Sequence, residues 1–278
     1  MVLCFSTKGK VYWMKVYDLP QAGRNAKGKP LVNLLPLDAN EMISAVLPVK
    51  NFEDGNYVFM ATSNGTVKKT ALENFSRPRA NGIIAIDLLE SDQLVGVGLT
   101  EGDQDIMLFC TSGKAIRFCE TDVREMGRTA RGVRGIKMPD ECWVNAMLIT
   151  DKEADVSVLT ATEQGYGKRT ALSEYSRQGR GGQGSISIQV TERNGNAVGA
   201  ILVTEEDEAM LITNGGTLVR TRMAEVSVIG RNTQGVRLID VKGEELLISV
   251  EKVVESDEDE EFSESDEVAV ETEADSDE

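Results

Sequence analysis

Lysine and arginine are concentrated in five short windows of this 278-residue chain, and clusters of such side chains bind anions. The windows are residues 8–29, 68–79, 114–137, 168–180 and 220–237. They hold 25 of the 30 basic residues and only 7 of the 46 acidic ones, although the whole chain has a net charge of −16. Basic clusters with so few carboxylates are typical of surfaces that bind a phosphate backbone. Solvation of exposed strands is the plainer alternative, but a solvated face usually mixes both signs of charge.

A pair of glycines recurs with each basic window. The first glycine of each pair is Gly9, Gly65, Gly113, Gly165 or Gly216, and the second follows at a nearly constant spacing, at Gly28, Gly82, Gly132, Gly184 or Gly235. The period of about 48 to 56 residues predicts an array of five similar units, each of which buries an apolar face against its neighbours. If the units stack around a ring, their basic windows form a belt around the outside or along one rim.

The second repeat indicates what one unit builds. β-Prone runs cover residues 57–60, 66–70, 83–86 and 94–99, and Asn64-Gly65 predicts a hairpin turn because both residues tolerate positive φ. Four short strands per unit is the number in a propeller blade. Single helical turns are expected around residues 71–75 and 171–175. The fold class is therefore predicted to be all-β, a β-propeller of five recognisable repeats that forms one domain over residues 1–254.

The end of the chain, residues 255–278, has a different composition. It contains 14 acidic residues and no basic ones, and too few apolar side chains to offset the entropy of ordering. We expect a disordered acidic tail. One hypothesis is that the tethered tail competes with an anionic ligand for the basic belt, and the alternative is that it only keeps the chain soluble.

No set of residues favours catalysis. The chain has no histidine, and no serine or cysteine lies in a nucleophile elbow, so we expect no catalytic residue. The four cysteines lack metal-ligand spacing and are expected to be reduced, partly buried thiols: Cys4, Cys110, Cys119 and Cys142. Asp103 and Asp105 are interpreted as part of a solvated hairpin loop rather than a metal pair. We therefore expect no metal and no cofactor in this chain. Because it has no apolar run long enough to span a membrane, we expect a cytoplasmic protein.

Five strings of residues are distinctive: Lys15 to Pro20, Asn64 to Thr70, Gly132 to Lys137, Gly165 to Thr170 and Gly230 to Gly235. They closely resemble the C-terminal domain of the bacterial DNA gyrase A protein, and the similarity runs in order from residue 1 to about 254. The resemblance implies a β-pinwheel, a propeller variant that swaps strands between blades and wraps DNA around its basic perimeter. It also implies a six-bladed family fold, of which the first blade would be truncated in this chain.

The resemblance further implies a function within a larger, chromosome-associated assembly. The expected partners are double-stranded DNA, the gyrase A N-terminal catalytic region and the gyrase B subunit in an A2B2 complex. That complex is a type II topoisomerase that introduces negative supercoils, with ATP and Mg bound by its other parts. A C-terminal domain of the topoisomerase IV A-type subunit and a non-enzymatic protein-interaction propeller remain as alternatives.

In the family, a box with the pattern Q-R-R-G-G-K-G lies in the first blade and is needed for wrapping. No good match stands near the N-terminus of this chain. The nearest string is Gln178-Gly179-Arg180-Gly181-Gly182-Gln183-Gly184, in the fourth repeat. It is interpreted either as a DNA contact through Arg180 and exposed backbone amides or as a glycine-rich crossing between blades.

Duplex DNA is favoured over single strands because aromatic residues make up only 5% of the chain and do not recur within the basic windows. The predicted contacts are sixteen basic side chains drawn from four of the five windows. They are Lys68, Lys69, Arg77, Arg79, Arg117, Arg128, Arg131, Arg134, Lys168, Arg169, Arg177, Arg180, Arg220, Arg222, Arg231 and Arg237.

Overall fold

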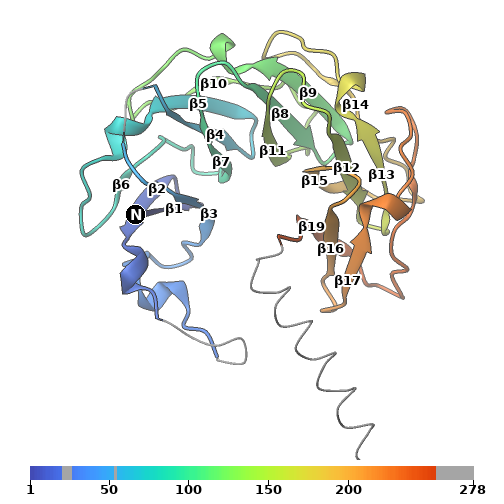
Figure 1. The fold of residues 1–278 in the computed structure, drawn as a ribbon, viewed down its shortest axis with the longest axis horizontal. Coiled ribbons are helices and arrows are strands. Elements are labelled where there is room, and N and C mark those ends of the chain that lie inside the picture. The colour runs from blue at the N-terminus through green and yellow to red at the C-terminus, as the bar shows by residue number, and fades with distance from the viewer. Residues whose placement is uncertain (21–26, 53–54, 255–278) are drawn as a thin grey trace, which may run out of the picture.

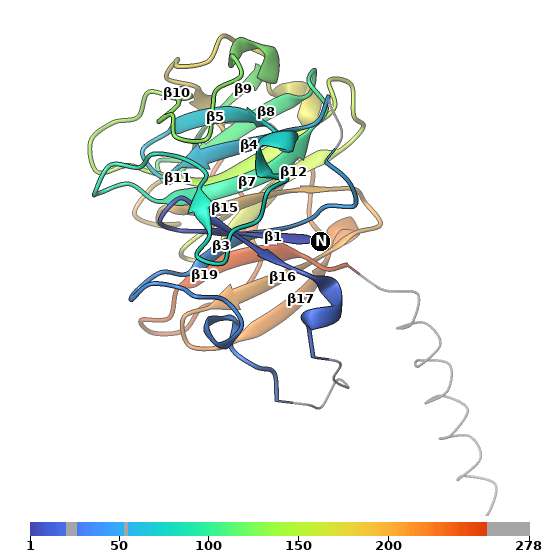
Figure 2. The same cartoon turned by 90° about the vertical axis from the view of Figure 1, so that its left-hand side faces the viewer.

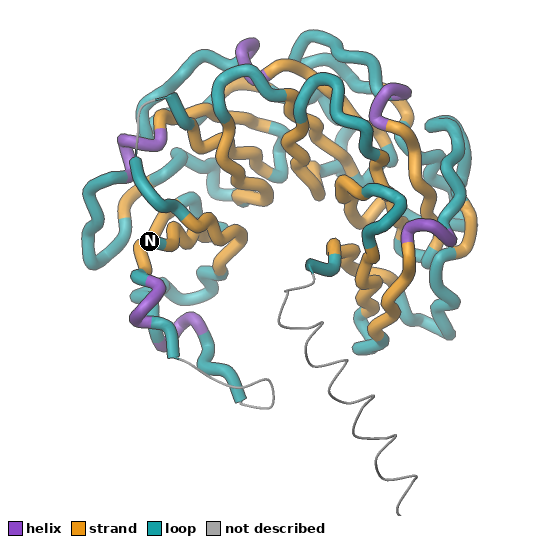
Figure 3. The backbone as a smooth tube through the Cα atoms, in the orientation of Figure 1, coloured by secondary structure: helices purple, strands orange, loops and turns teal. Residues whose placement is uncertain are grey.

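The computed structural model describes residues 1–20, 27–52 and 55–254, which fold into five small antiparallel sheets set along an arc (Figures 1 and 3). The predicted acidic tail, residues 255–278, lies outside the described residues. In each sheet the first strand lies nearest the centre of the arc and the last lies at its outer edge. In chain order, the sheets are β3-β1-β2-β6, β7-β4-β5-β10, β11-β8-β9-β14, β15-β12-β13-β18 and β19-β16-β17. The side view shows the sheets stacked one behind another (Figure 2). The all-β propeller predicted from the repeats is confirmed.

The strand bounds follow the repeats closely. The first two repeats supply β1 (Val2–Ser6), β2 (Lys10–Met14), β3 (Ile43–Pro48), β4 (Tyr57–Thr62), β5 (Thr66–Ala71), β6 (Ile83–Ile84) and β7 (Leu94–Thr100). The next two supply β8 (Asp105–Cys110), β9 (Lys114–Cys119), β10 (Val133–Arg134), β11 (Val144–Thr150), β12 (Ser157–Thr162), β13 (Tyr166–Ala171), β14 (Ser185–Ile186) and β15 (Ala197–Val203). The fifth supplies β16 (Glu208–Thr213), β17 (Leu218–Arg222), β18 (Val236–Arg237) and β19 (Leu247–Lys252).

Helical structure in the described part of the chain is limited to single 3-10 turns. They are η1 (Val16–Asp18), η2 (Leu31–Asn33), η3 (Leu72–Phe75), η4 (Glu120–Asp122), η5 (Leu172–Glu174) and η6 (Met223–Glu225). The single turns expected around residues 71–75 and 171–175 are therefore present as η3 and η5. Among the described residues, no helix is long and apolar enough to span a membrane.

The first glycine of each repeat lies in the turn of a hairpin. In the second repeat the amide of Gly65 donates to the carbonyl of Thr62 at 2.9 Å, and Gly65 has a φ of +78°. Asn64 keeps a negative φ, so the left-handed conformation is carried by Gly65 alone, as in a type I turn followed by a glycine bulge. A β-carbon on Gly65 would also meet Ile136 Cγ2 of the next repeat at 2.8 Å.

The fourth strand of a sheet comes from the following repeat. β6, β10, β14 and β18 pair with β2, β5, β9 and β13, the outer hairpin strands of the preceding repeats. In each case the second recurring glycine stands immediately before the swapped strand, and at Gly132 a β-carbon would lie 2.5 Å from the carbonyl oxygen of Val67. The turn carbonyl of Gly65 then accepts the amides of Gly135 at 2.8 Å and Ile136 at 3.3 Å. Strand exchange, which the resemblance implied, is therefore present.

The expected truncation of the first blade is not found. Within the described residues the first sheet has four strands, and the incomplete sheet is the last, β19-β16-β17, which has three. The first sheet is complete because the second repeat supplies its outermost strand, β6. The last sheet is followed by no described repeat that could supply a fourth strand to β17.

The hydrophobic core lies between successive sheets. On β4, Val58 and Met60 pack in one cluster with Phe5 of the first sheet, whereas Phe59 and Ala61 pack in the next cluster with residues of β8. Side chains alternate between the two faces of a strand, so a strand between two sheets is buried on both. All six residues of β8 are buried, but burial alternates along β16, whose second face is only partly covered.

We predict that Gly132→Ala lowers the free energy of unfolding by about 1–3 kcal/mol, because Gly132 has a φ of +109° and its new methyl group would collide with the Val67 carbonyl. Gly127→Ala, in the same connection, is the matched control. Gly127 is exposed and has no atom within 4 Å of an added β-carbon, so its substitution should change stability by less than about 0.5 kcal/mol. Urea unfolding of the two variants measures the difference, and equal stabilities would contradict the role given to Gly132.

Candidate nucleic-acid interface

Exposed arginines gather at the outer edge of the arc. Nine of the sixteen predicted contacts are exposed: Arg77, Arg79, Arg131, Arg134, Arg177, Arg180, Arg220, Arg222 and Arg237. Arg134 and Arg237 lie on the outermost strands β10 and β18, and Arg220 and Arg222 lie on β17. The others lie in the connections that lead to β6, β10 and β14. The strands and connections that carry these arginines therefore lie along the outer edge of the arc at successive sheets (Figure 1).

Three arginines also hold the sheets together. The guanidinium groups of Arg128, Arg180 and Arg231 donate to the carbonyls of Ile84 (3.2 Å), Arg134 (3.1 Å) and Ile186 (3.1 Å), the second residues of β6, β10 and β14. Arg128 and Arg231 are half-buried and Arg180 is exposed. All three stand at the same distance along the sequence from the turn glycine of their repeat, a regularity that could have revealed this shared role.

The box-like string forms a crossing between sheets. Gln178 donates its amide to the carbonyl of Arg117, Gly181 donates to Gly135 at 2.6 Å, and Gly182 accepts the amide of Lys137 at 2.8 Å. The side chain of Arg180 adds a bond from Nε to the carbonyl of Asp122 at 2.8 Å. These bonds favour the interpretation of the string as a glycine-rich crossing. Arg180 is exposed in this crossing, although its guanidinium group donates hydrogen bonds to two backbone carbonyls.

Five predicted contacts are buried, and the structure corrects their assignment. Lys68, Lys69, Arg117, Lys168 and Arg169 are each at most 7% exposed. They lie on β5, β9 and β13, which are covered by neighbouring sheets and by swapped strands, so their charged groups do not reach the rim. The charge of a basic window did not predict exposure here, because these strands lie between neighbouring sheets and both of their faces are covered, so even adjacent residues such as Lys68 and Lys69 are both buried.

Two of these cations are lysines, and each binds at least one backbone carbonyl of the next repeat. Lys68 Nζ donates to the carbonyls of Ala85 (2.6 Å) and Arg128, and Lys168 Nζ donates to those of Gly230 (2.7 Å) and Arg231. Burial lowers the pKa of Lys68 to about 7, with a further lowering by the Arg128 guanidinium and an opposing effect of Asp87. Burial likewise lowers the pKa of Lys168 to about 8, with Arg231 lowering and Glu174 raising it.

The other three buried cations lie four residues after the turn glycine and contact the 3-10 turn of the next repeat. Arg117 binds the carbonyls of Leu172 (3.1 Å) and Tyr175 (3.3 Å), at or next to η5. Arg169 Nε binds the carbonyl of Val226 at 2.7 Å, and Lys69 Nζ lies 3.8 Å from the carboxylate of Glu120 in η4. Sequence reasoning missed this bracing role, although the constant spacing from the turn glycine was present.

Asp105 is also placed differently from the expectation. It is the first residue of β8, fully buried, and its carboxylate lies 2.7 Å from Arg117 Nε and 2.6 Å from Arg177 Nη2. The solvated-loop interpretation was therefore wrong for Asp105, whereas Asp103 is exposed. Within the part of the chain that the structure describes, no group of three or more His, Cys, Asp or Glu residues could hold a metal ion.

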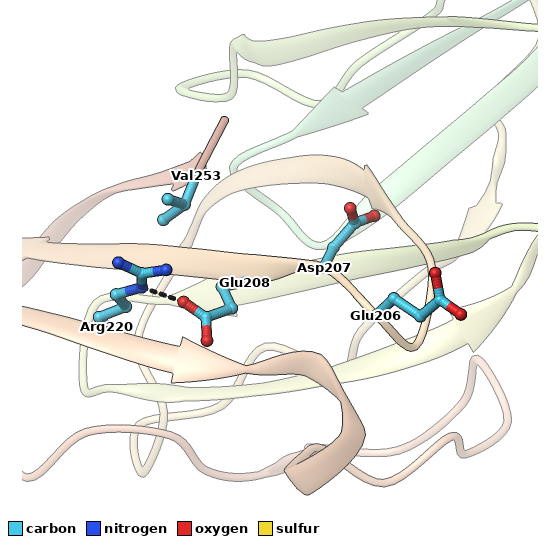
Figure 4. Close-up of a pocket in the computed structure, with 5 residues that line it drawn as sticks. All are labelled: Glu206, Asp207, Glu208, Arg220 and Val253. Atoms are coloured by element: carbon cyan, nitrogen blue, oxygen red, sulfur yellow. Dashed lines mark hydrogen bonds and ion pairs between the residues drawn. The ribbon is translucent and has the colours of Figure 1, made fainter. Parts of the chain in front are cut away.

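The rim arginines differ in how far carboxylates neutralise them. Arg131 pairs with Asp87 (2.9 Å) and Arg237 with Asp240 (2.9 Å). Arg220 and Arg222 both pair with Glu208. Arg220 and Glu208 line a pocket of 200 Å³ together with Glu206 and Asp207 (Figure 4). In contrast, the guanidinium groups of Arg77, Arg79 and Arg134 form no ion pair and donate no hydrogen bond to any residue in the described ranges. Among the nine exposed predicted contacts, these three side chains carry the least compensated positive charge.

The buried lysines predict a specific pH dependence of stability. The folded-state pKa of Lys68, about 7, lies below the ordinary value of 10.5, so between these pH values the unfolded chain binds one proton more than the folded chain. This difference makes the free energy of unfolding rise with pH across the window, and the contribution is lost as pH falls through about 7.

Lys68→Met should therefore reduce the slope of stability against pH between 7 and 10 by up to one proton. Urea unfolding at several pH values measures that slope. Lys137→Met, which alters an exposed lysine, should retain the slope of the unmodified chain. Equal slopes for Lys68→Met and the unmodified chain would show that the Lys68 ammonium is not held in the way the geometry indicates.

Five segments of the chain match one protein family, described as DNA gyrase C-terminal domain, beta-propeller. The segments are residues 1–50, 56–101, 104–151, 157–204 and 207–253, each containing one repeat. The chain is 56% identical over 261 residues to the DNA gyrase A protein of Salmonella typhimurium, covering 94% of this chain and 30% of that protein. It is 52% identical over 254 residues to the DNA gyrase A protein of Escherichia coli, covering 91% of this chain and 29% of that protein.

Solved structures of two related domains share the fold. The C-terminal domain of DNA topoisomerase IV matches with a TM-score of 0.86 and 26% identity, over 96% of this chain and 83% of that one. A DNA gyrase A C-terminal domain matches with a TM-score of 0.78 and 26% identity, over 91% of this chain and 82% of that one. The chain spans less than a third of the gyrase A relatives named above. With its five repeats matched and its propeller formed, the chain belongs to the DNA gyrase C-terminal domain family.

Proposed function

We propose that this chain binds duplex DNA along its outer rim and wraps it, as a module of the DNA gyrase A protein. The observation that carries the proposal is the position of the exposed arginines, which lie on the outermost strand of each sheet or in the connection to it. A duplex that follows this convex edge meets a basic side chain at each successive sheet. Neutralisation of phosphates, with release of counterions, supplies the binding free energy.

The rim favours contacts with the backbone over readout of bases. The helical elements of the described chain are 3-10 turns of three or four residues, too short to enter a major groove as a recognition helix. Arginines spaced along a curved surface instead bind phosphates and favour sequences that bend at low cost. Binding should therefore depend strongly on salt and weakly on sequence.

In the assembled enzyme, the wrap would present a DNA crossing of fixed sign to the catalytic parts. We propose partnership with the N-terminal catalytic region of gyrase A and with the gyrase B subunit in an A2B2 complex in the cytoplasm. ATP hydrolysis, Mg and DNA cleavage would be supplied by those parts, and this chain would contribute no catalytic residue. Its role would be to direct ATP-dependent strand passage toward negative supercoiling.

A topoisomerase IV module is the second candidate, favoured by the TM-score of 0.86 to that enzyme's C-terminal domain. Identities of 52% and 56% to gyrase A proteins favour gyrase. A protein-interaction propeller is less well supported, because such surfaces are rich in exposed aromatic anchors. Trp143 is 52% exposed and Tyr17 is 76% exposed, but Tyr17 belongs to the first repeat and Trp143 to the third.

A topological assay tests wrapping directly. A nicked plasmid is sealed by ligase with the purified full-length chain bound, and the linking number is compared with that of plasmid sealed alone. We expect a positive shift that grows with protein concentration and disappears at high salt, because the wrap is chiral and electrostatic.

Two other results would argue against the proposal. Binding without a change in linking number would contradict wrapping and favour the topoisomerase IV alternative. Failure to bind duplex DNA at low salt would favour the protein-interaction propeller. Charge reversal of Lys68, Lys69, Lys168 and Arg169 is unsuitable as a control, since these buried residues brace the fold and their variants would report on folding.

A further inference from the structure

One groove on the rim concentrates uncompensated positive charge. It lies where the η3-to-β6 connection of the second repeat meets the loop of the third repeat that precedes β10, and its volume is 440 Å³. Arg77, Arg79 and Arg128 line it, together with the polar side chains of Asn74 and Ser76 and the carboxylate of Glu73. Three arginines and one glutamate therefore line this concave site.

The arginines of this groove retain free hydrogen-bonding capacity. Arg77 and Arg79 are exposed, and their guanidinium groups have no partner among the described residues. Arg128 uses Nη1 for the carbonyl of Ile84 at 3.2 Å, which leaves most of its N–H groups available. Guanidinium forks fit phosphate oxygens in geometry as well as in charge.

The loop that carries Arg128 is fixed before any ligand arrives. Its carbonyl is held by the buried ammonium of Lys68, which also binds the carbonyl of Ala85 at 2.6 Å. Together with the bond to Ile84, this contact holds the Arg128 main chain and side chain against the edge of the first sheet. Little conformational entropy then remains to be lost when an anion binds.

A second groove, formed in part by equivalent residues, does not share this charge. It has a volume of 480 Å³ and is lined by Glu174, Ile186, Gly230, Arg231, Asn232 and Thr233. Arg231 is the equivalent of Arg128, but Gly179 stands at the position of Arg79. Arg177, the equivalent of Arg77, is paired with the buried carboxylate of Asp105 at 2.6 Å. The two grooves are therefore unequal, and the more positive one lies between the first and second sheets.

We propose that the groove formed by Arg77, Arg79 and Arg128 is a dedicated subsite for the phosphodiester backbone of duplex DNA and the main anchor of the wrap. The inference rests on the proposed function and deepens it, because it assigns different contributions to DNA affinity to blades that are built from equivalent repeats. Arg77 and Arg79 bind backbone phosphates, and Arg128 completes the site from the neighbouring repeat. Lys68 acts as a positioning residue for Arg128 and touches no DNA.

The test compares two double variants that each remove two exposed positive charges. Arg77→Gln with Arg79→Gln alters the groove, whereas Arg131→Gln with Arg237→Gln alters arginines that Asp87 and Asp240 already pair. Affinity for a short blunt-ended duplex is measured by fluorescence anisotropy over a range of NaCl concentrations. Thermal unfolding of both variants checks that the propeller remains folded.

We expect the groove variant to lower the slope of log affinity against log salt by about 1.8, the value for two phosphate contacts, and to weaken binding by at least about tenfold at low salt. The paired-arginine variant should change the slope by less than about 0.5. Inorganic phosphate, added at constant ionic strength, should compete weakly, since a subsite for the duplex backbone draws its affinity from adjoining contacts.

The outcomes separate the two proposals. Absence of salt-dependent binding by the unmodified chain would overturn the proposed function and the subsite together. Normal binding by that chain with equal losses in the two double variants would overturn the subsite alone. Strong competition by inorganic phosphate would also overturn it, because the groove would then be a site for a free anion.

Discussion

The structure depends on the transfer of one strand from each repeat to the sheet of the repeat before it. An isolated three-stranded sheet would leave an edge without hydrogen-bonding partners and two apolar faces in water. The two-residue strand β10 pairs with β5, and the carbonyl of Gly65 accepts two amides of the same incoming segment. Gly132 permits this close approach because it has no β-carbon. Each repeat therefore completes its neighbour and fixes its position.

The buried cations belong to the same system of contacts. A desolvated ammonium is costly unless it is hydrogen-bonded, and Lys68 and Lys168 offset this cost with backbone carbonyls. Lys68 binds Ala85 of its own repeat and Arg128 of the following one, and Lys168 binds Gly230 and Arg231 of the following repeat. Ile116 occupies the equivalent position in the third repeat and is fully buried, so an apolar side chain also satisfies the packing there. The lysines add what an isoleucine cannot, a directional link to a loop that carries a half-buried arginine.

The rim is regular in shape and irregular in charge. Strand exchange places the connections of successive repeats at equivalent positions along the arc, which accounts for the common edge on which the arginines lie. Local carboxylates then decide how much of each charge remains. Glu208 pairs with Arg220 and Arg222 at the last sheet, whereas Arg77 and Arg79 near the first sheet stay uncompensated within the described chain. Affinity for an anion should therefore vary from blade to blade.

The sequence by itself determined the features that are local or periodic: five repeats, hairpins closed by glycine, short strands and an all-β fold. Turn geometry at Gly65 depends on neighbouring residues, and the recurrence of the pattern can be counted directly. The tertiary structure alone decided which basic residues reach solvent. Lys68 and Arg134 both lie on strands in basic windows, yet Lys68 is buried beneath elements contributed by another repeat and Arg134 lies on the outermost strand. Likewise Asp105, which was expected in solvent, is enclosed by arginines from two repeats. Burial of this kind depends on contacts between residues far apart in the chain, and no local pattern of residue types encodes which repeat will cover which side chain.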